Sequence, residues 1–179
     1  MVDFKNLQEP YFIGEIGINH NGDLQLAKKL IDAVNACGWH CAKFQKRNPD
    51  VCVPEHQKMV MRQTPWGEMT YLDYKYRIEF GDAEYNKINQ YCSDKPLDWT
   101  ASVWDLDSLN FLLEYNVPFL KIPSALITND ELVIESAKSN KPMIISTGMS
   151  TLEEIDKAVE NVIKHNDNLV IMHTNSSYP

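Results

Sequence analysis

The chain has 179 residues, of which 44% are apolar and 23% are charged. This composition is typical of a globular protein with a packed core and excludes a disordered chain. The net charge of −8 repels the phosphates of nucleic acids, and no cluster of Lys and Arg offsets it locally. We therefore expect a single domain, spanning residues 1–179, with no nucleic-acid partner.

The sequence also gives expectations about compartment. No apolar run approaches the roughly 20 residues that a membrane-spanning helix needs, and Met1–Pro10 lacks the basic and then apolar pattern of a signal peptide. We expect a cytoplasmic protein with no membrane partner. The cysteines lack CxxC spacing and are expected to pack as small apolar residues. They are Cys37, Cys41, Cys52 and Cys92.

Short apolar runs alternate with amphipathic segments along the whole chain, which is the pattern of repeated βα units. The runs are mostly continuous, as in parallel strands that are buried on both faces. The predicted strands are Phe12–Ile18, Cys41–Lys46, Trp99–Trp104, Phe119–Ile122, Met143–Thr147 and Leu169–Thr174.

The first predicted helix follows the first strand. Apolar residues recur at helical spacing from Leu24 to Val34. Asn21 or Asp23 is available as its N-cap and Gly38 as its stop.

A second strong apolar stripe covers residues 152–163, where Ser150 and Glu153 have the spacing of a capping box. Shorter stripes predict helices at 85–91, 109–113 and 132–139.

One interval of the repeat is much longer than the others. Strand starts lie about 20 to 30 residues apart, as in ordinary βα units, but nearly sixty residues separate the second and third. Residues 47–81 carry Pro49, Pro54 and Pro65 and show no clean periodicity. We expect a long excursion with short helical pieces, and such ordered loops are often functional.

Repeated βα units fit either an open doubly wound sheet or a barrel. Gly14, Gly17 and Gly22 after the first strand do not form the G-x-G-x-x-G fingerprint of a dinucleotide-binding sheet, so the barrel is favoured. The predicted fold is α/β, an incomplete TIM (β/α)8-type barrel with about six βα units. Two units are missing, and exposed strand edges predict self-association or a complementary chain that supplies the missing strands.

In a βα barrel the site forms at the carboxyl ends of the strands. Polar residues are found there on almost every strand: Glu15, Asn19, His20, Asn21, Lys43, Gln45, Ser102, Asp105, Lys121, Ser124, Ser146, Thr147, His173, Thr174 and Asn175. Lys43 and Lys121 lie inside apolar strands, where a buried ammonium is costly unless an anion compensates it. With the serines nearby, they predict a cradle for phosphate and carboxylate groups, to which the turn Ser146–Met149 adds backbone N–H donors.

Each of these residues also has a simpler interpretation. Either lysine could form an ion pair with Glu15 in the barrel mouth. His173, at the end of an apolar strand, could be a core histidine rather than a metal ligand. His20 could belong to a polar turn that places Gly22 at positive φ.

Seven motifs, in the same order along the chain, resemble those of the sialic-acid synthase family, which includes the legionaminic- and pseudaminic-acid synthases. They are Phe12–Gly22, Lys43–Lys46, Thr64–Tyr71, Glu79-Phe80, Lys121–Ser124, Ser146–Met149 and His173–Pro179. The resemblance covers about residues 9–179 and therefore most of the chain.

The resemblance implies a synthase in which C3 of phosphoenolpyruvate attacks the aldehyde of N-acetylmannosamine or a related amino sugar, and phosphate is released after water adds at C2. It implies a divalent metal, Mn²⁺ or Mg²⁺, that polarises the aldehyde. It assigns phosphoenolpyruvate binding to Lys43, Ser102, Lys121, Ser124 and Ser146. It assigns catalytic roles to Glu15 and Gln45 and metal binding to His173.

Three departures from the family pattern accompany this resemblance. The Ser-Asp-His-Thr segment that carries a second metal-binding histidine does not occur in the sequence, nor does the C-terminal antifreeze-like domain. Leu126 stands where many members have an acidic residue. The sequence therefore predicts the N-terminal catalytic barrel portion of a synthase, incomplete as a lone chain.

Two other functions remain open. A non-catalytic remnant could bind phosphoenolpyruvate or a partner subunit, since the lysines are retained. Another barrel aldolase or lyase could use Lys43 or Lys121 as a Schiff-base amine.

Overall fold

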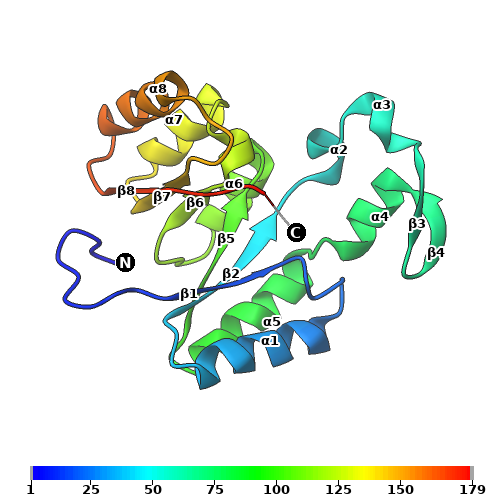
Figure 1. Ribbon diagram of the computed structural model, residues 1–179. Coiled ribbons are helices and arrows are strands. Elements are labelled where there is room, and N and C mark those ends of the chain that lie inside the picture. The colour runs from blue at the N-terminus through cyan, green and yellow to red at the C-terminus, as the bar shows by residue number, and fades with distance from the viewer. Residues whose placement is uncertain (1, 178–179) are drawn as a thin grey trace. The chain divides into compact units, whose positions relative to one another are not determined.

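The computed structural model describes residues 2–177, which divide into two compact units (Figure 1). One unit is Phe12–Trp99. The other combines the residues before Phe12 with those from Thr100 onward. All six predicted strands are present, and each pairs in parallel with a neighbour of its own unit.

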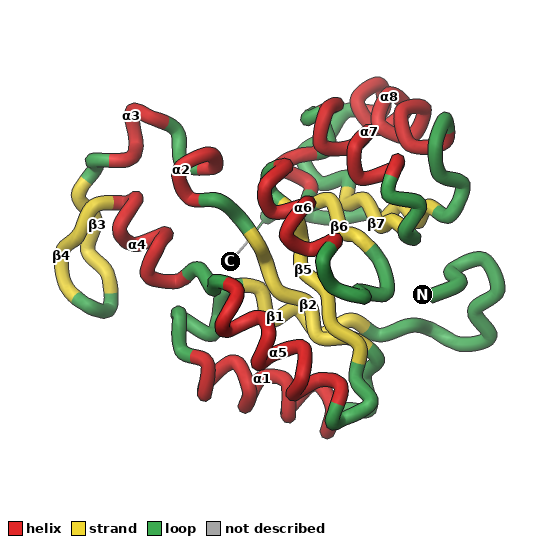
Figure 2. Tube along the Cα trace, turned by 180° about the vertical axis from the view of Figure 1, so that it is seen from behind, coloured by secondary structure: helices red, strands yellow, loops and turns green. Residues whose placement is uncertain are grey.

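In the unit Phe12–Trp99, strand β1 (Ile13–Gly17) pairs with β2 (Cys41–Lys46), and Glu15 is the register partner of Lys43. Helices α1 (Leu24–Ala36) and α5 (Asp82–Ser93) lie side by side along these strands (Figure 2). Both helices bury an apolar stripe, which includes Ile31 of α1 and Tyr85 of α5. The first predicted helix and the stripe at 85–91 are thus confirmed.

The ends of α1 show which of the predicted signals operate. Asp23, and not Asn21, is the N-cap, and its carboxylate accepts hydrogen bonds from the N–H groups of Gln25 at 2.7 Å and Leu26 at 3.3 Å. Gly38 ends the helix at φ +67°, a left-handed conformation in which a side chain would be strained.

The excursion is more regular than the sequence suggested. It contains α2 (Pro49–Cys52), α3 (Glu55–Lys58), β3 (Met61–Thr64), β4 (Gly67–Thr70) and α4 (Tyr71–Ile78). The expectation of a loop with only short helical pieces was wrong, because β3 and β4 form an antiparallel hairpin. Both strands are largely exposed and so carry no buried alternation to reveal them. The hairpin turn instead relies on Thr64, whose hydroxyl donates to the Gly67 carbonyl at 2.7 Å.

The other unit contains four parallel strands in the order β5 (Asp98–Val103), β6 (Leu120–Ile122), β7 (Met143–Ser146) and β8 (Leu169–Met172), with β5 starting at the end of the first unit. The helical elements are α6 (Leu106–Leu113), η1 (Ser124–Leu126), α7 (Asp130–Lys138) and α8 (Leu152–Ile163). Helices α7 and α8 pack side by side (Figure 1). The stripes predicted at 109–113, 132–139 and 152–163 are therefore all helical.

The N-cap of α8 corrects a prediction by one residue. Thr151, not Ser150, accepts from the backbone N–H of Glu154 at 3.2 Å, and the Glu154 carboxylate accepts from the Thr151 N–H at 2.8 Å. Both residue pairs have the spacing of a capping box, but the Ser150 hydroxyl donates instead to the Gly148 carbonyl at 3.3 Å. The turn before the helix therefore decides which hydroxyl caps it.

Within residues 2–177, no helix combines the length and the apolar character that crossing a membrane requires. Within residues 2–177 the four cysteines form no disulfide, and burial raises the pKa of the Cys92 thiol to about 12.

Candidate active site

In the unit Phe12–Trp99, the pairing of β1 with β2 brings two predicted site residues together. Lys43 Nζ lies 2.8 Å from Glu15 Oε2. The lysine side chain is 4% exposed and the glutamate side chain 62% exposed. The ion pair that was the simpler interpretation of these residues is therefore present, with its carboxylate on the solvent side. The anion-binding role of Lys43 and the catalytic role of Glu15 stay predictions.

Gln45 lies two residues further along β2, on the same side of the strand as Lys43. Its side-chain oxygen accepts a hydrogen bond from the Arg47 guanidinium, and its backbone carbonyl accepts from the Tyr85 hydroxyl at 3.0 Å. Arg47 Nε lies 3.7 Å from Glu79 Oε2. Lys46 Nζ lies 3.3 Å from the other oxygen of this carboxylate, Oε1. Burial raises the pKa of the Glu79 carboxyl. The positive charges of Lys46 and Arg47 lower it, but by less than burial raises it.

His20 lies in the turn that follows β1. It is 2% exposed, and its ring stacks on Phe80 with 3.9 Å between ring centroids. Its Nδ1 accepts from the Gly22 N–H at 3.1 Å, and Gly22 has φ +72°. Burial lowers the pKa of His20 to about 4, so the ring is neutral near pH 7. The polar-turn interpretation of His20 is confirmed.

In the other unit, three predicted residues share one face of the sheet. Ser102 of β5 is the register partner of Lys121 of β6, and Lys121 is the partner of Ile144 of β7. Ser146 follows Ile144 by two residues and so points to the same face. Ser102, Lys121 and Ser146 are 3%, 6% and 7% exposed. The strand register therefore places one buried ammonium and two buried hydroxyls together.

Ser146 has a further property that bears on ligand binding. Its hydroxyl forms no hydrogen bond with any residue that the structure describes, although the residue is more than nine-tenths buried. A bound ligand oxygen that reaches this face of the sheet could therefore accept a hydrogen bond from it.

The turn after β7 contacts Ser124, the third predicted serine of this unit. The Gly148 N–H donates to the Ser124 hydroxyl at 3.0 Å, which leaves the Ser124 proton for another acceptor. A Cβ on Gly148 would lie 2.1 Å from Ser176 Oγ, 3.0 Å from Ser124 Oγ and 3.2 Å from the Thr174 carbonyl. A larger residue at position 148 would force Ser176 to shift, a constraint that the sequence pattern did not reveal.

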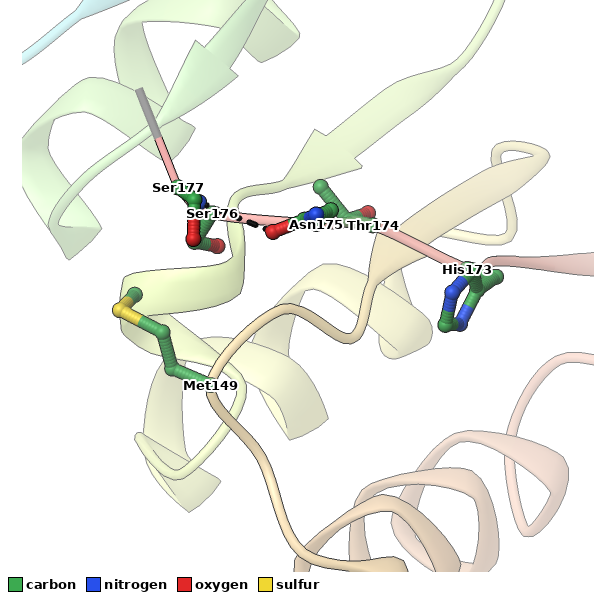
Figure 3. A pocket seen from close by; sticks show the side chains of 6 residues that line it. All are labelled: Met149, His173, Thr174, Asn175, Ser176 and Ser177. Carbon is green, nitrogen blue, oxygen red and sulfur yellow. Dashed lines mark hydrogen bonds between the residues drawn. The ribbon is translucent and has the colours of Figure 1, made fainter. Parts of the chain in front are cut away.

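A pocket of about 410 Å³ opens beside this turn (Figure 3). Met149 and the segment after β8 line it, and His173 and Met149 lie at its two ends. Along its wall the Asn175 side-chain oxygen accepts from the Ser177 N–H at 3.0 Å. His173 is exposed here, so it is not the buried core residue of the simpler interpretation.

The described residues beside His173 do not form a complete metal site by themselves. Across residues 2–177, no group of three or more His, Cys, Asp or Glu side chains is arranged to hold an ion. One exposed imidazole is not a metal site, since manganese and magnesium favour several oxygen ligands. The metal-ligand role of His173 stays a prediction.

The predicted residues thus fall into two groups, Glu15, Lys43 and Gln45 in one unit and Ser102, Lys121, Ser124, Ser146 and His173 in the other. That both groups bind one ligand stays a prediction. Arg47, which contacts Gln45, was not predicted from the sequence, and the motif Glu79-Phe80 was the signal that could have led to it.

Comparison with known proteins decides the family. A model of the NeuB family matches residues 30–179. The chain belongs to the NeuB family.

The similarity to NeuB-family relatives extends over nearly the whole chain. The chain is 35% identical to an N-acetylneuraminate-9-phosphate synthase of Drosophila melanogaster, over 100% of this chain and 49% of that protein. It is 33% identical to an N,N'-diacetyllegionaminic acid synthase of Legionella pneumophila, over 94% of this chain and 49% of that protein. The chain spans about half the length of these curated relatives.

Solved structures confirm the fold class of this NeuB-family chain. A crystal structure of an N-acetylneuraminic acid synthetase from Leptospira borgpetersenii matches with a TM-score of 0.84 and 31% identity, over 96% of this chain and 56% of that one. A truncated 3-deoxy-D-arabino-heptulosonate 7-phosphate synthase from Thermotoga maritima matches with a TM-score of 0.67 at 12% identity, over 99% of this chain and 58% of that one, which supports the fold alone. The predicted α/β fold of the incomplete-barrel type is confirmed.

Proposed function

We propose that this chain forms part of a synthase that condenses phosphoenolpyruvate with an amino-sugar aldehyde such as N-acetylmannosamine. C3 of phosphoenolpyruvate attacks the aldehyde carbon, water adds at C2, and the C2–O bond to phosphate breaks. Membership of the NeuB family supports this reaction class, because relatives over the whole chain are named N-acetylneuraminate-9-phosphate synthase and N,N'-diacetyllegionaminic acid synthase.

The observation that carries the proposal is the buried group formed by Ser102, Lys121 and Ser146. An ammonium and two hydroxyls on one face of a sheet suit a small anion with several acceptor oxygens. The Ser146 hydroxyl can donate a hydrogen bond to an oxygen of such a ligand. In this proposal Lys121 neutralises charge on phosphoenolpyruvate, and the serine hydroxyls orient its oxygens.

In the unit Phe12–Trp99, Lys43 is proposed to bind phosphoenolpyruvate, whereas Glu15 and Gln45 are proposed to take part in catalysis. Glu15 of β1 is largely exposed and lies beside the Lys43 ammonium. It is placed to exchange a proton with water or with a sugar oxygen, and Gln45 supplies a hydrogen bond. A divalent metal, Mn²⁺ or Mg²⁺, would polarise the aldehyde when bound, with His173 as its predicted ligand from this chain. The cytoplasmic location expected from the sequence remains part of this proposal.

The decisive experiment supplies the portion of the family that this chain does not span. The purified chain is mixed with a polypeptide that carries the C-terminal half of a family member. Phosphate release is then measured with phosphoenolpyruvate, N-acetylmannosamine and manganese. We expect release that requires both polypeptides and both substrates.

The matched controls are Lys121→Met, which should abolish phosphate release, and Lys29→Met on the exposed side of α1, which should not. Failure of the wild-type mixture to release phosphate, while calorimetry still detects phosphoenolpyruvate binding, would favour a non-catalytic binding protein. A borohydride-trapped adduct with pyruvate would favour the Schiff-base alternative.

We also propose that a complementary chain or a second copy covers the outer side of β8 and α8. Ile171 and Met172 of β8 are 48% and 43% exposed, and Leu152 and Ile163 of α8 are 79% and 58% exposed. Apolar side chains grouped beside the last strand of a sheet are typical of a surface that packs against further structure. Ile171→Lys should weaken association with the complementary polypeptide in analytical ultracentrifugation, and unchanged association would contradict this proposal.

A further inference from the structure

The strongest charge cluster outside the predicted site surrounds Glu79, at the end of the excursion. Its side chain is 7% exposed, as is that of Arg47, and the Lys46 side chain is 13% exposed. The carboxylate accepts from Lys46 Nζ at 3.3 Å and from the Arg47 backbone N–H at 3.1 Å. Burying three charges is expensive and does not by itself favour stability, so the cluster calls for another explanation.

Arg47 connects this cluster to Gln45. One guanidinium N–H group donates to the Gln45 side-chain oxygen, while the guanidinium Nε lies 3.7 Å from Glu79. A guanidinium has only donors, so it must face the oxygen of the amide and not the nitrogen. The Tyr85 hydroxyl holds the backbone carbonyl of Gln45 at 3.0 Å. Both ends of Gln45 are therefore fixed.

The amide nitrogen of Gln45 consequently points away from Arg47. It lies 3.6 Å from the position that a Cβ on Gly17 would occupy, at the irregularity where β1 ends. No described residue accepts a hydrogen bond from it. The side chain therefore presents N–H donors and no acceptor at the carboxyl end of β2.

We propose that Glu79 is a positioning residue that, by holding Arg47, fixes the Gln45 amide so that its N–H donors face a carbonyl or carboxylate oxygen of the substrate. This inference rests on the proposed function for the identity of that substrate. Glu79 itself touches no reacting atom, and it acts through Arg47. The excursion therefore contributes to the site through one buried carboxylate.

The orientation of Gln45 can be measured without any activity. In a ¹⁵N–¹H correlation spectrum of the whole chain, the side-chain amide pair of Gln45 is assigned by its loss in Gln45→Glu. In Glu79→Gln, and in Arg47→Lys, we expect this pair to move toward the shifts of the exposed Gln25. Circular dichroism verifies that each variant remains folded.

Tyr76→Phe is the matched control, because it removes the Tyr76–Asp50 hydrogen bond of the same excursion without touching Arg47. The chemical shifts of the Gln45 side-chain amide pair should not change in this control. Unchanged Gln45 signals in both folded variants, Glu79→Gln and Arg47→Lys, would overturn the proposal.

The kinetic test uses the chain with its complementary polypeptide. Glu79→Gln should lower kcat/KM by about 10- to 100-fold, as small misplacements of a site residue do. The double variant Glu79→Gln, Gln45→Ala should be no slower than Gln45→Ala alone, whereas a merely structural role would give additive losses. Additive losses would refute positioning. An inactive wild-type mixture with a clear Gln45 response would instead refute the proposed function while leaving the positioning of the amide intact.

Discussion

The two units hold their candidate site residues by different means. In Phe12–Trp99, ion pairs fix the carboxyl ends of the strands, as in Lys43 with Glu15 and Arg47 with Glu79. In the unit from Thr100 onward, neutral groups meet at the end of β7, where the Gly148 N–H donates to Ser124. The first arrangement depends on protonation states and the second on close steric fit. Changes in charge should therefore affect the first unit most, and changes in volume the second.

The largest expected effect tests whether both units serve one ligand. Lys43→Met and Lys121→Met should each weaken phosphoenolpyruvate binding by about 100-fold, because each removes charge-assisted hydrogen bonds. Isothermal titration calorimetry measures both affinities, with Lys29→Met as the exposed control. If only Lys121→Met weakens binding, the two units do not share the ligand.

The next effect concerns acid sensitivity in the first unit. The pKa of His20 is lowered from 6.5 to about 4. The stability that the neutral, buried imidazole contributes to the folded state is therefore complete above pH 6.5 and is lost as the pH falls toward 4. The loss in unfolding free energy between pH 7 and 4.5 should be about 2 to 3 kcal/mol, at about 1.4 kcal/mol per pKa unit. Asn in place of His20 still offers an oxygen to the Gly22 N–H but does not titrate.

Urea unfolding at the two pH values checks this prediction. His20→Asn should show a smaller loss than the wild type, whereas His165→Asn, at an exposed position, should lose as much as the wild type. Equal losses in the wild type and His20→Asn would show that the buried imidazole does not set the acid limit.

A smaller effect tests the steric arrangement of the second unit. Gly148→Ala should weaken phosphoenolpyruvate binding by about 10-fold, because the new methyl group displaces Ser176 and presses on Ser124. Gly81→Ala is the control, since its Cβ would approach only Glu84, at 3.7 Å. An unchanged affinity in Gly148→Ala would mean that the turn does not contact the ligand.

The smallest effect tests the corrected helix cap. Thr151→Ala should lower the unfolding free energy by about 1 kcal/mol, as loss of an N-cap does, and Ser150→Ala by less. Thermal unfolding of both variants measures the difference. A larger loss in Ser150→Ala would restore the original prediction of the cap.

Much of the fold was predictable because its signals are local. Strands such as Met143–Ser146 are largely apolar runs, and α1 is an apolar stripe with a cap at Asp23. The hairpin β3–β4 was not predictable, because exposed strands show no periodicity of burial. The site was predicted as a set of residues through the order of its motifs, but their contacts were not.

The sequence by itself determined the βα order, the NeuB-type motifs and the presence of lysines within apolar strands, since each depends on neighbouring residues and on the cost of burying charge. Only the tertiary structure decided that Glu15 pairs with Lys43, that Ser146 lies on the same face as Lys121, and that Glu79 reaches Arg47. Those contacts join residues far apart along the chain. Strand register and the path of the excursion fix them, and no local pattern encodes either one.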